Sequence, residues 1–151
     1  MEIRIKQIGL WRTEVAHRPG ALAKALEPLA QQGADLKVVR VRTAPQKKAR
    51  KIIEVYAGKG PRAQMAAQAA GFSLTPRTTL LLQGDNQPGF AYAVANAVAW
   101  TGISVRDHEA GVVANQFSST LTFDSEAEAR KAALLIRKVI RGISTKNQTE
   151  R

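Results

Sequence analysis

The sequence repeats itself at a constant spacing of 69 positions. The Pro-Gly pair at positions 19–20 recurs at 88–89, and Gly33 recurs as Gly102. No insertion is needed to align the two copies from this turn to the third strand expected in each. Self-similarity at a fixed period indicates repeated structural units, each of which must bury one apolar face. We therefore expect the chain to fold as two copies of one module.

Hydrophobic periodicity predicts the same order of elements in both copies. Alternating residues between Ile3 and Ile8 are typical of a half-buried strand, and apolar residues at helical spacing follow the first Pro-Gly turn. In the first copy, the expected strands and helices cover residues 3–15, 21–33, 36–42, 52–56, 61–70 and 72–75. In the second copy, they cover residues 78–83, 90–101, 103–107, 117–123, 125–141 and 142–145, the last being a short closing strand. This strand and helix order is βαββαβ, the split βαβ pattern of ferredoxin-like folds.

The fold class predicted from this order is α+β. We expect two ferredoxin-like modules, each an antiparallel sheet with helices on one face, packed side by side. The expected modules are residues 1–75 and 76–145, and the polar residues 146–151 are expected to form a frayed tail.

The second Pro-Gly turn carries a resemblance to a known family. Asp85 and Asn86 stand shortly before the Pro-Gly pair, an apolar helix pattern follows, and Gly102 precedes the next strand. This pattern resembles the ACT-domain family of small amino-acid-binding modules, and a weaker copy begins at His17. The resemblance implies a regulatory or sensor protein that binds an amino acid at the interface of two modules. The ligand-binding residues that it implies are Asp85, Asn86, Gln87, Pro88, Gly89 and Phe90 in the second copy, with His17, Arg18 and Gly20 in the first.

The residue chemistry of the second turn is compatible with an amino acid. Backbone N–H groups at the start of the helix near Gly89 can hold a carboxylate, and Asp85 or Asn86 can accept from an ammonium group. The alternative is that Asp85 or Asn86 only caps the helix. Because Ala16 stands where the second copy has Asp85, we expect the second copy to be better equipped for binding.

The charge distribution leaves a second function open. The net charge is +11, and residues 1–75 hold 14 Lys+Arg against 5 Asp+Glu, whereas residues 76–151 hold 9 against 7. A basic half with the run Lys47, Lys48, Arg50 and Lys51 is compatible with a nucleic-acid partner or with a solvated hairpin. Readers of single strands stack bases on aromatic side chains, for which Trp11 and Tyr56 are the candidates. A third alternative is an interaction module without a ligand.

The remaining residue patterns argue against catalysis. Cysteine is absent, the two histidines His17 and His108 lack ligand-spaced partners, and no catalytic triad or phosphate-binding loop can be assembled. We expect no catalytic residue, no metal and no cofactor. The chain shows no signal-peptide pattern and no apolar run of membrane length, so a cytoplasmic protein without membrane contact is expected. Because residues 90–100 are apolar on nearly every face, we expect the outer face of this helix to pack against the other repeat or against a second chain in a homodimer.

Overall fold

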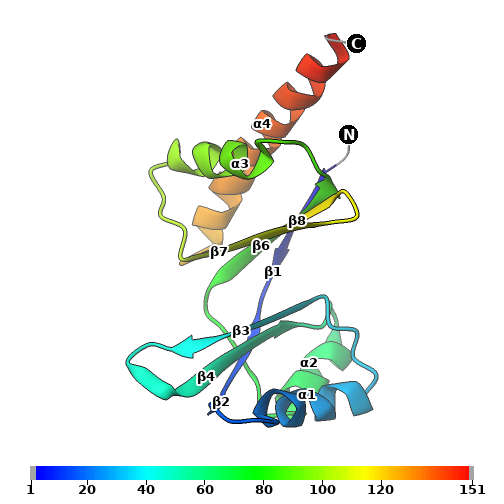
Figure 1. Cartoon of the computed structure of the whole chain (residues 1–151), viewed down its shortest axis with the longest axis vertical. Helices are drawn as coiled ribbons and strands as arrows, with labels where there is room; N and C mark the ends of the chain where they lie inside the picture. Colours follow the sequence, from blue (N-terminus) through cyan, green and yellow to red (C-terminus); the bar gives the residue numbers. More distant parts are fainter. Residues whose placement is uncertain (1–2, 150–151) are drawn as a thin grey trace. The chain divides into compact units, whose positions relative to one another are not determined.

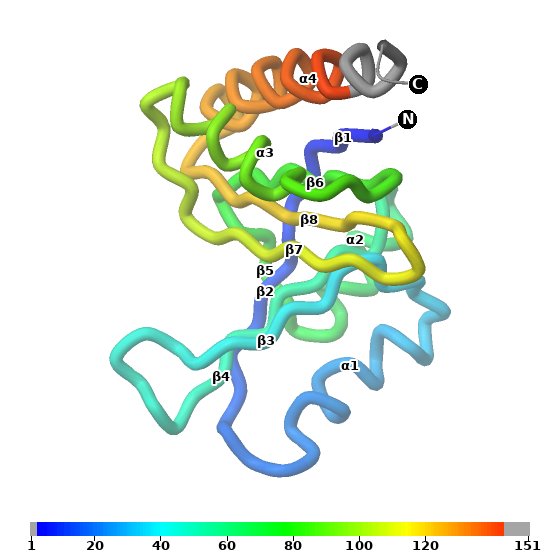
Figure 2. The backbone as a smooth tube through the Cα atoms, turned by 45° about the horizontal axis from the view of Figure 1, so that its top comes forward, coloured from blue at the N-terminus to red at the C-terminus, as the bar shows by residue number. Residues whose placement is uncertain are grey.

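The computed structural model describes the backbone of residues 3–149 and the side chains of residues 3–143. Contacts within the chain divide it into two units (Figures 1 and 2). The inserted unit is Gly9–Thr75, and the split unit comprises the residues up to Ile8 and from Pro76 onward.

The inserted unit has the complete βαββαβ order. Its antiparallel sheet runs in the order β3-β4-β2-β5, and α1 and α2 lie on one face of it (Figure 1). Trp11, Leu29, Val55 and Phe72 are among the buried residues between sheet and helices. Its elements are β2 (Trp11–Ala16), α1 (Ala21–Gln31), β3 (Val38–Ala44), β4 (Lys47–Tyr56), α2 (Pro61–Ala69) and β5 (Ser73–Leu74).

The split unit has the same layout with one strand from a distant part of the chain. Its sheet runs β1-β6-β8-β7, again antiparallel, with α3 and α4 on one face (Figure 1). Leu80, Phe90, Leu121 and Ile136 lie in its core. Its elements are β1 (Ile3–Ile8), β6 (Thr78–Asp85), α3 (Phe90–Ala99), β7 (Asp107–Val113), β8 (Gln116–Phe123) and α4 (Glu126–Thr149). The predicted α+β class with two ferredoxin-like modules is confirmed.

The predicted division of the chain at its N-terminal end differs from the observed one. We assigned residues 1–75 to one module, but β1 pairs with β6, from Ile3 opposite Gly84 to Ile8 opposite Thr79. Ile3 and Ile5 pack against the split unit's core. In the inserted unit the first-strand position is taken by β2, which pairs with β4 on one side and β5 on the other.

The predicted closing strand at residues 142–145 is helical. Ile136 and Ile140 are buried and Ile143 is half-buried, so the apolar helical spacing continues past Gly142 and α4 extends to Thr149. The strand β1 occupies the sheet edge that a closing strand would have filled. The predicted frayed tail is therefore helical over residues 146–149, while residues 150–151 lie outside the described residues.

Helix α3 buries one face and exposes another. Phe90, Val94, Ala97 and Val98 are buried, whereas Tyr92 and Trp100 are 73% and 79% exposed. The expected burial of this apolar helix on more than one side is therefore not met within the chain.

Candidate functional site

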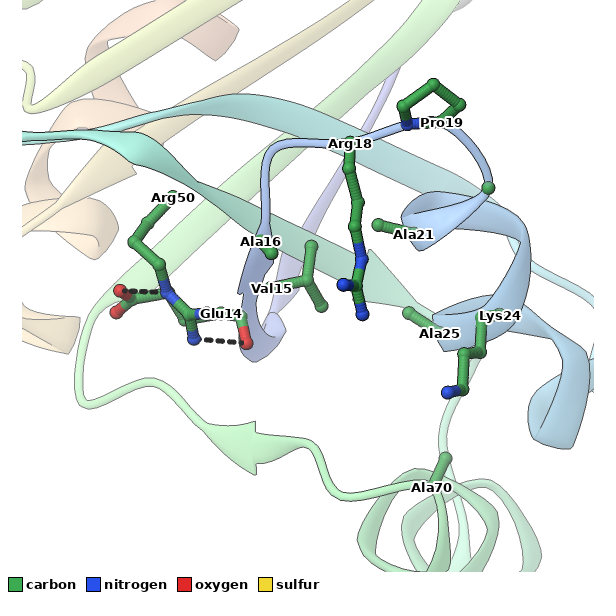
Figure 3. A pocket seen from close by; sticks show the side chains of 11 residues that line it. Glu14, Val15, Ala16, Arg18, Pro19, Ala21, Lys24, Ala25, Arg50 and Ala70 are labelled. Carbon is green, nitrogen blue, oxygen red and sulfur yellow. Dashed lines mark hydrogen bonds and ion pairs between the residues drawn. The ribbon is translucent and has the colours of Figure 1, made fainter.

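A cavity of about 470 Å³ lies at the Pro-Gly turn of the inserted unit (Figure 3). It is formed where β2 ends and α1 begins, with β4 on one side and the end of α2 on the other. Volumes of this order are typical of small-molecule sites. The residues that line it are Glu14, Val15, Ala16, Arg18, Pro19, Gly20, Ala21, Lys24, Ala25, Arg50 and Ala70.

The turn leaves the start of α1 open. Gly20 has φ 82° and ψ −9°, a left-handed conformation that glycine adopts without a steric penalty. The Ala21 N–H donates to the Arg18 carbonyl at 3.3 Å, but no side chain caps α1 and its first turn holds no acidic residue. Backbone N–H groups in a first helical turn lack partners within the helix, and the helix dipole makes this end favourable for negative charge.

Two cations extend toward the cavity without a partner of their own. The side chains of Arg18 and Lys24 point into it from the turn and from α1 (Figure 3). Both residues are exposed, and neither side chain forms an ion pair or hydrogen bond with any part of the chain that the structure describes. Their charges are therefore available to a ligand.

The third cation is held by the cavity's carboxylate. Arg50 donates from Nε to Glu14 Oε1 at 3.2 Å and from Nη2 to the backbone oxygen of Glu14 at 3.3 Å (Figure 3). Lys47 Nζ lies 3.7 Å from the same carboxylate oxygen. The hydrogen bond from Arg50 lowers the pKa of Glu14; partial desolvation opposes this shift and the charge of Lys47 adds to it.

The rest of the lining is small and apolar. Val15, Ala21, Ala25 and Ala70 present short side chains around the space between the charged groups (Figure 3). The cavity can therefore take a small molecule that carries one or more acidic groups on a short carbon skeleton.

A second cavity, of about 450 Å³, lies in the split unit on strands β1, β6 and β8. Within it, Gln116 Nε2 donates to Asp85 Oδ1 at 2.8 Å. It combines one cation, one carboxylate and neutral polar groups, and its lining residues are Arg4, Gln83, Gly84, Asp85, Gln116, Phe117 and Ser118.

The comparison with known proteins rests on structure. No protein-family model and no curated protein sequence matches the chain. A solved structure of a protein from Bacteroides thetaiotaomicron matches with a TM-score of 0.70 and 12% identity, over 89% of each chain. The regulatory subunit of aspartate kinase from Thermus thermophilus matches with a TM-score of 0.63 and 16% identity, over 92% of this chain and 97% of that one. The regulatory subunit of aspartate kinase from Thermus flavus gives 0.59 and 16%, over 93% and 97%.

The chain has the tandem ACT-domain fold. At these identities the likeness establishes the fold alone, so the site must be judged from this chain's own residues.

Within this ACT-type fold, the residues predicted at the second turn do not converge on one cavity. Asp85 lines the cavity of the split unit, but Phe90 is 2% exposed and packs edge-on against Phe117, with ring centroids 4.7 Å apart. Asn86 donates its backbone N–H to the Asn115 carbonyl at 2.9 Å. Gln87 accepts from the Phe90 N–H at 3.1 Å, Pro88 is an exposed turn residue, and Gly89 begins α3. Residues 86–89 therefore contribute to the structure of the turn, and Phe90 belongs to the core.

At the first turn, the structure brings two of the three predicted residues to the cavity. Arg18 and Gly20 line it, whereas His17 is exposed and uses its backbone N–H to bond the Ala49 carbonyl at 2.8 Å. Sequence reasoning missed Glu14, Lys24 and Arg50. Lys24 lies one helical turn after Gly20 and could have been found from helix periodicity, but Arg50 arrives through the pairing of Ala16 with Arg50 between β2 and β4.

Four further observations bear on the other functions considered. Trp11 and Tyr56 are only 8% and 4% exposed, so the aromatic side chains considered for base stacking are buried. Among the described residues no group of side chains suits a metal ion. His108 lies 3.0 Å, Nε2 to Oγ, from Ser119, and burial lowers its pKa. No helix in the described part of the chain is long and apolar enough to cross a membrane.

Proposed function

We propose that this protein is a non-catalytic regulatory protein that binds an amino acid or a closely similar small effector in the cavity of the inserted unit. The observation that carries the proposal is the convergence of Arg18, Lys24 and the open start of α1 on one cavity beside Glu14. The regulatory subunits of aspartate kinase with the same fold make a regulatory role the natural choice.

The cavity offers a partner for each part of an amino acid. Arg18 or Lys24 would hold the α-carboxylate, because charge-assisted hydrogen bonds from cations to carboxylates are among the stronger polar contacts. The ammonium group would lie against the Glu14 carboxylate, which Arg50 keeps ionised. Val15, Ala25 and Ala70 would contact the carbon skeleton.

The cavity in the split unit is the second place considered for the same kind of ligand. Asp85 could accept from an ammonium group and Arg4 could hold a carboxylate there, but that cavity has one cation in its lining, whereas the inserted unit offers both Arg18 and Lys24. Mutations in each cavity distinguish which of the two binds the effector. Arg18→Ala should remove binding if the inserted unit holds the effector, and Asp85→Ala should remove it if the split unit does.

Calorimetric titration of the full chain with each proteinogenic amino acid tests the proposal. We expect heat with at least one of them, retained in Asp85→Ala and lost in Arg18→Ala. Loss in Asp85→Ala alone would move the site to the split unit. Absence of heat with every amino acid would leave the interaction module without a ligand as the better hypothesis.

Dimerisation is part of the proposal as well, because the exposed Tyr92 and Trp100 leave an apolar face of α3 uncovered within the chain. Light scattering at several protein concentrations measures it directly.

The nucleic-acid hypothesis loses support at the same residues. Glu14 pairs with two of the basic hairpin's cations, Lys47 and Arg50, and the candidate stacking residues Trp11 and Tyr56 are buried. We therefore do not advance it as a second function.

A further inference from the structure

We infer that the cavity of the inserted unit selects ligands that carry two acidic groups over ligands that carry one. This inference rests on the proposed function, since it names the chemical class of the effector for the same cavity. Two carboxylates, or a carboxylate and a phosphate, on a short carbon skeleton share the required chemistry.

The charges that line the cavity do not balance. Arg18, Lys24 and Arg50 face a single carboxylate, that of Glu14, so two positive charges are in excess. Arg50 is already satisfied by Glu14, which leaves Arg18 and Lys24 as the two cations without partners among the described residues. A zwitterionic amino acid with one carboxylate would supply one negative charge and would also bring in a positive one. A dianion supplies one acidic group for each free cation.

The repeat provides an internal control for this excess. The positions 69 residues after Arg18 and Lys24 are Gln87 and Ala93, both uncharged. The counterpart of Arg50 is the uncharged Gln116, because Gln116 lies opposite Asp85 in the strand register as Arg50 lies opposite Ala16. The turn in the split unit nevertheless has the same backbone, with φ 82° at Gly89 as at Gly20. The module therefore folds without these three cations. Glu14 accounts for Arg50, and a ligand would account for the convergence of the Arg18 and Lys24 side chains on the cavity.

The three cations also come from separate elements that meet only at the cavity. Arg18 lies in the turn, Lys24 in α1 and Arg50 in β4, and Figure 3 shows the Arg18 and Lys24 side chains directed into the same space. An exposed charge run on one strand would be solvated on its own, whereas a cavity with low-dielectric walls strengthens the attraction for a ligand of opposite charge. The small apolar residues Ala21, Ala25 and Ala70 leave space for a short linker between the two acidic groups.

The test is calorimetry on the full chain at low ionic strength with four probes. Aspartate and succinate carry two carboxylates, O-phosphoserine carries a carboxylate and a phosphate, and alanine carries a single carboxylate. We expect each two-acid probe that fits to bind at least about tenfold more tightly than alanine, a difference of about 1.4 kcal/mol. The ranking of aspartate, succinate and O-phosphoserine distinguishes an acidic amino acid, a dicarboxylate and a phosphorylated ligand.

Matched variants separate the cavity from general charge. Arg18→Gln and Lys24→Ala introduce the residues found at the equivalent positions of the split unit, and each should reduce the preference over alanine at least about fivefold. Lys48→Gln removes one positive charge from an exposed position of the same unit that does not line the cavity, and it should keep the preference. Circular dichroism checks that each variant is folded.

The outcomes distinguish a failure of the inference about two acidic groups from a failure of the proposed function. If alanine binds as tightly as the two-acid probes and Arg18→Gln removes both, the amino-acid function stands and the dianion inference is wrong. If Lys48→Gln weakens the preference as much as Arg18→Gln, the selectivity comes from net charge and the inference is also wrong. If no probe and no other amino acid binds, both the inference and the proposed function fail.

Discussion

The two strand-to-helix turns have the same backbone and different side chains. Gly20 and Gly89 share φ 82°, and the helices α1 and α3 begin at the next residue in each unit. Where the inserted unit has Ala21 lining a cavity, the split unit has Phe90 buried against Phe117. The comparison teaches that the Pro-Gly turn specifies the module, whereas the residues beside it decide whether space and charge remain for a ligand.

The largest effect on stability is expected from truncating Phe90, the aromatic residue that stands in the split unit at the position of Ala21. Phe90→Ala should lower the free energy of unfolding by about 3–5 kcal/mol, because it removes a fully buried aromatic side chain and leaves a cavity. Denaturant unfolding followed by circular dichroism measures the loss. Tyr92 lies on the same helix and is 73% exposed, so Tyr92→Ala is the control and should change the free energy of unfolding by less than about 0.5 kcal/mol. Equal costs for the two variants would show that Phe90 is not a core residue.

The converse substitution should close the cavity of the inserted unit. Ala21→Phe places an aromatic ring at the position where the split unit has one, and we expect effector binding to weaken at least about a hundredfold, about 2.7 kcal/mol, because the ring occupies the ligand's space. Calorimetry with the tightest-binding probe measures it. Ala23→Phe is the matched control, because Ala23 is exposed on the same helix and does not line the cavity. Unchanged binding in Ala21→Phe would place the ligand elsewhere.

Local patterns in the sequence were sufficient for the repeat and for most helices. The helical spacing after each Pro-Gly turn led to α1 and α3 within a few residues, because one amphipathic or apolar helix is decided by its own side chains. The end of α4 was missed because Gly142 resembles a stop signal, whereas Ile140 and Ile143 continue the spacing across it.

The sequence could not show which strands pair when they lie far apart in the chain. The alternation from Ile3 to Ile8 indicates a strand but does not say which sheet it joins, and the strand pairs with β6 far along the chain. The same limit applied to the site. Arg18 and Gly20 were predicted from the turn itself, but Arg50 reaches the cavity only through the register of β2 with β4. Phe90 was assigned to the ligand because it adjoins the Pro-Gly pair, although its aromatic ring has more to gain from burial.

The two turns share one backbone conformation, so replacing the glycine of either turn should lower the free energy of unfolding by the same amount. Gly20→Ala and Gly89→Ala should each destabilise the protein by about 1–2 kcal/mol, because the left-handed conformation places Cβ unfavourably against the backbone. A Cβ at either position would meet no atom of a residue beyond its chain neighbours within 4 Å, so contact with the surroundings adds no further cost. Gly142→Ala in α4 is the control, and it should stabilise the helix by up to about 1 kcal/mol. A large difference between the first two variants would mean that the turns are not equivalent.

The smallest effect concerns Glu14, a carboxylate at a position where the split unit has the uncharged Gln83. The Arg50 hydrogen bond lowers the pKa of Glu14, so the ionised side chain favours the folded state. This contribution is present above the ordinary pKa of glutamate and is lost as the pH falls through the lowered pKa of the folded protein. Arg50→Ser removes the donor and should raise the pKa of Glu14 toward its ordinary value in an NMR titration of the carboxyl group. Lys47→Ala should raise it less, because Lys47 lies 3.7 Å away and contributes mainly through its charge. A pKa that does not change in Arg50→Ser would show that the hydrogen bond from Arg50 does not hold the Glu14 carboxylate.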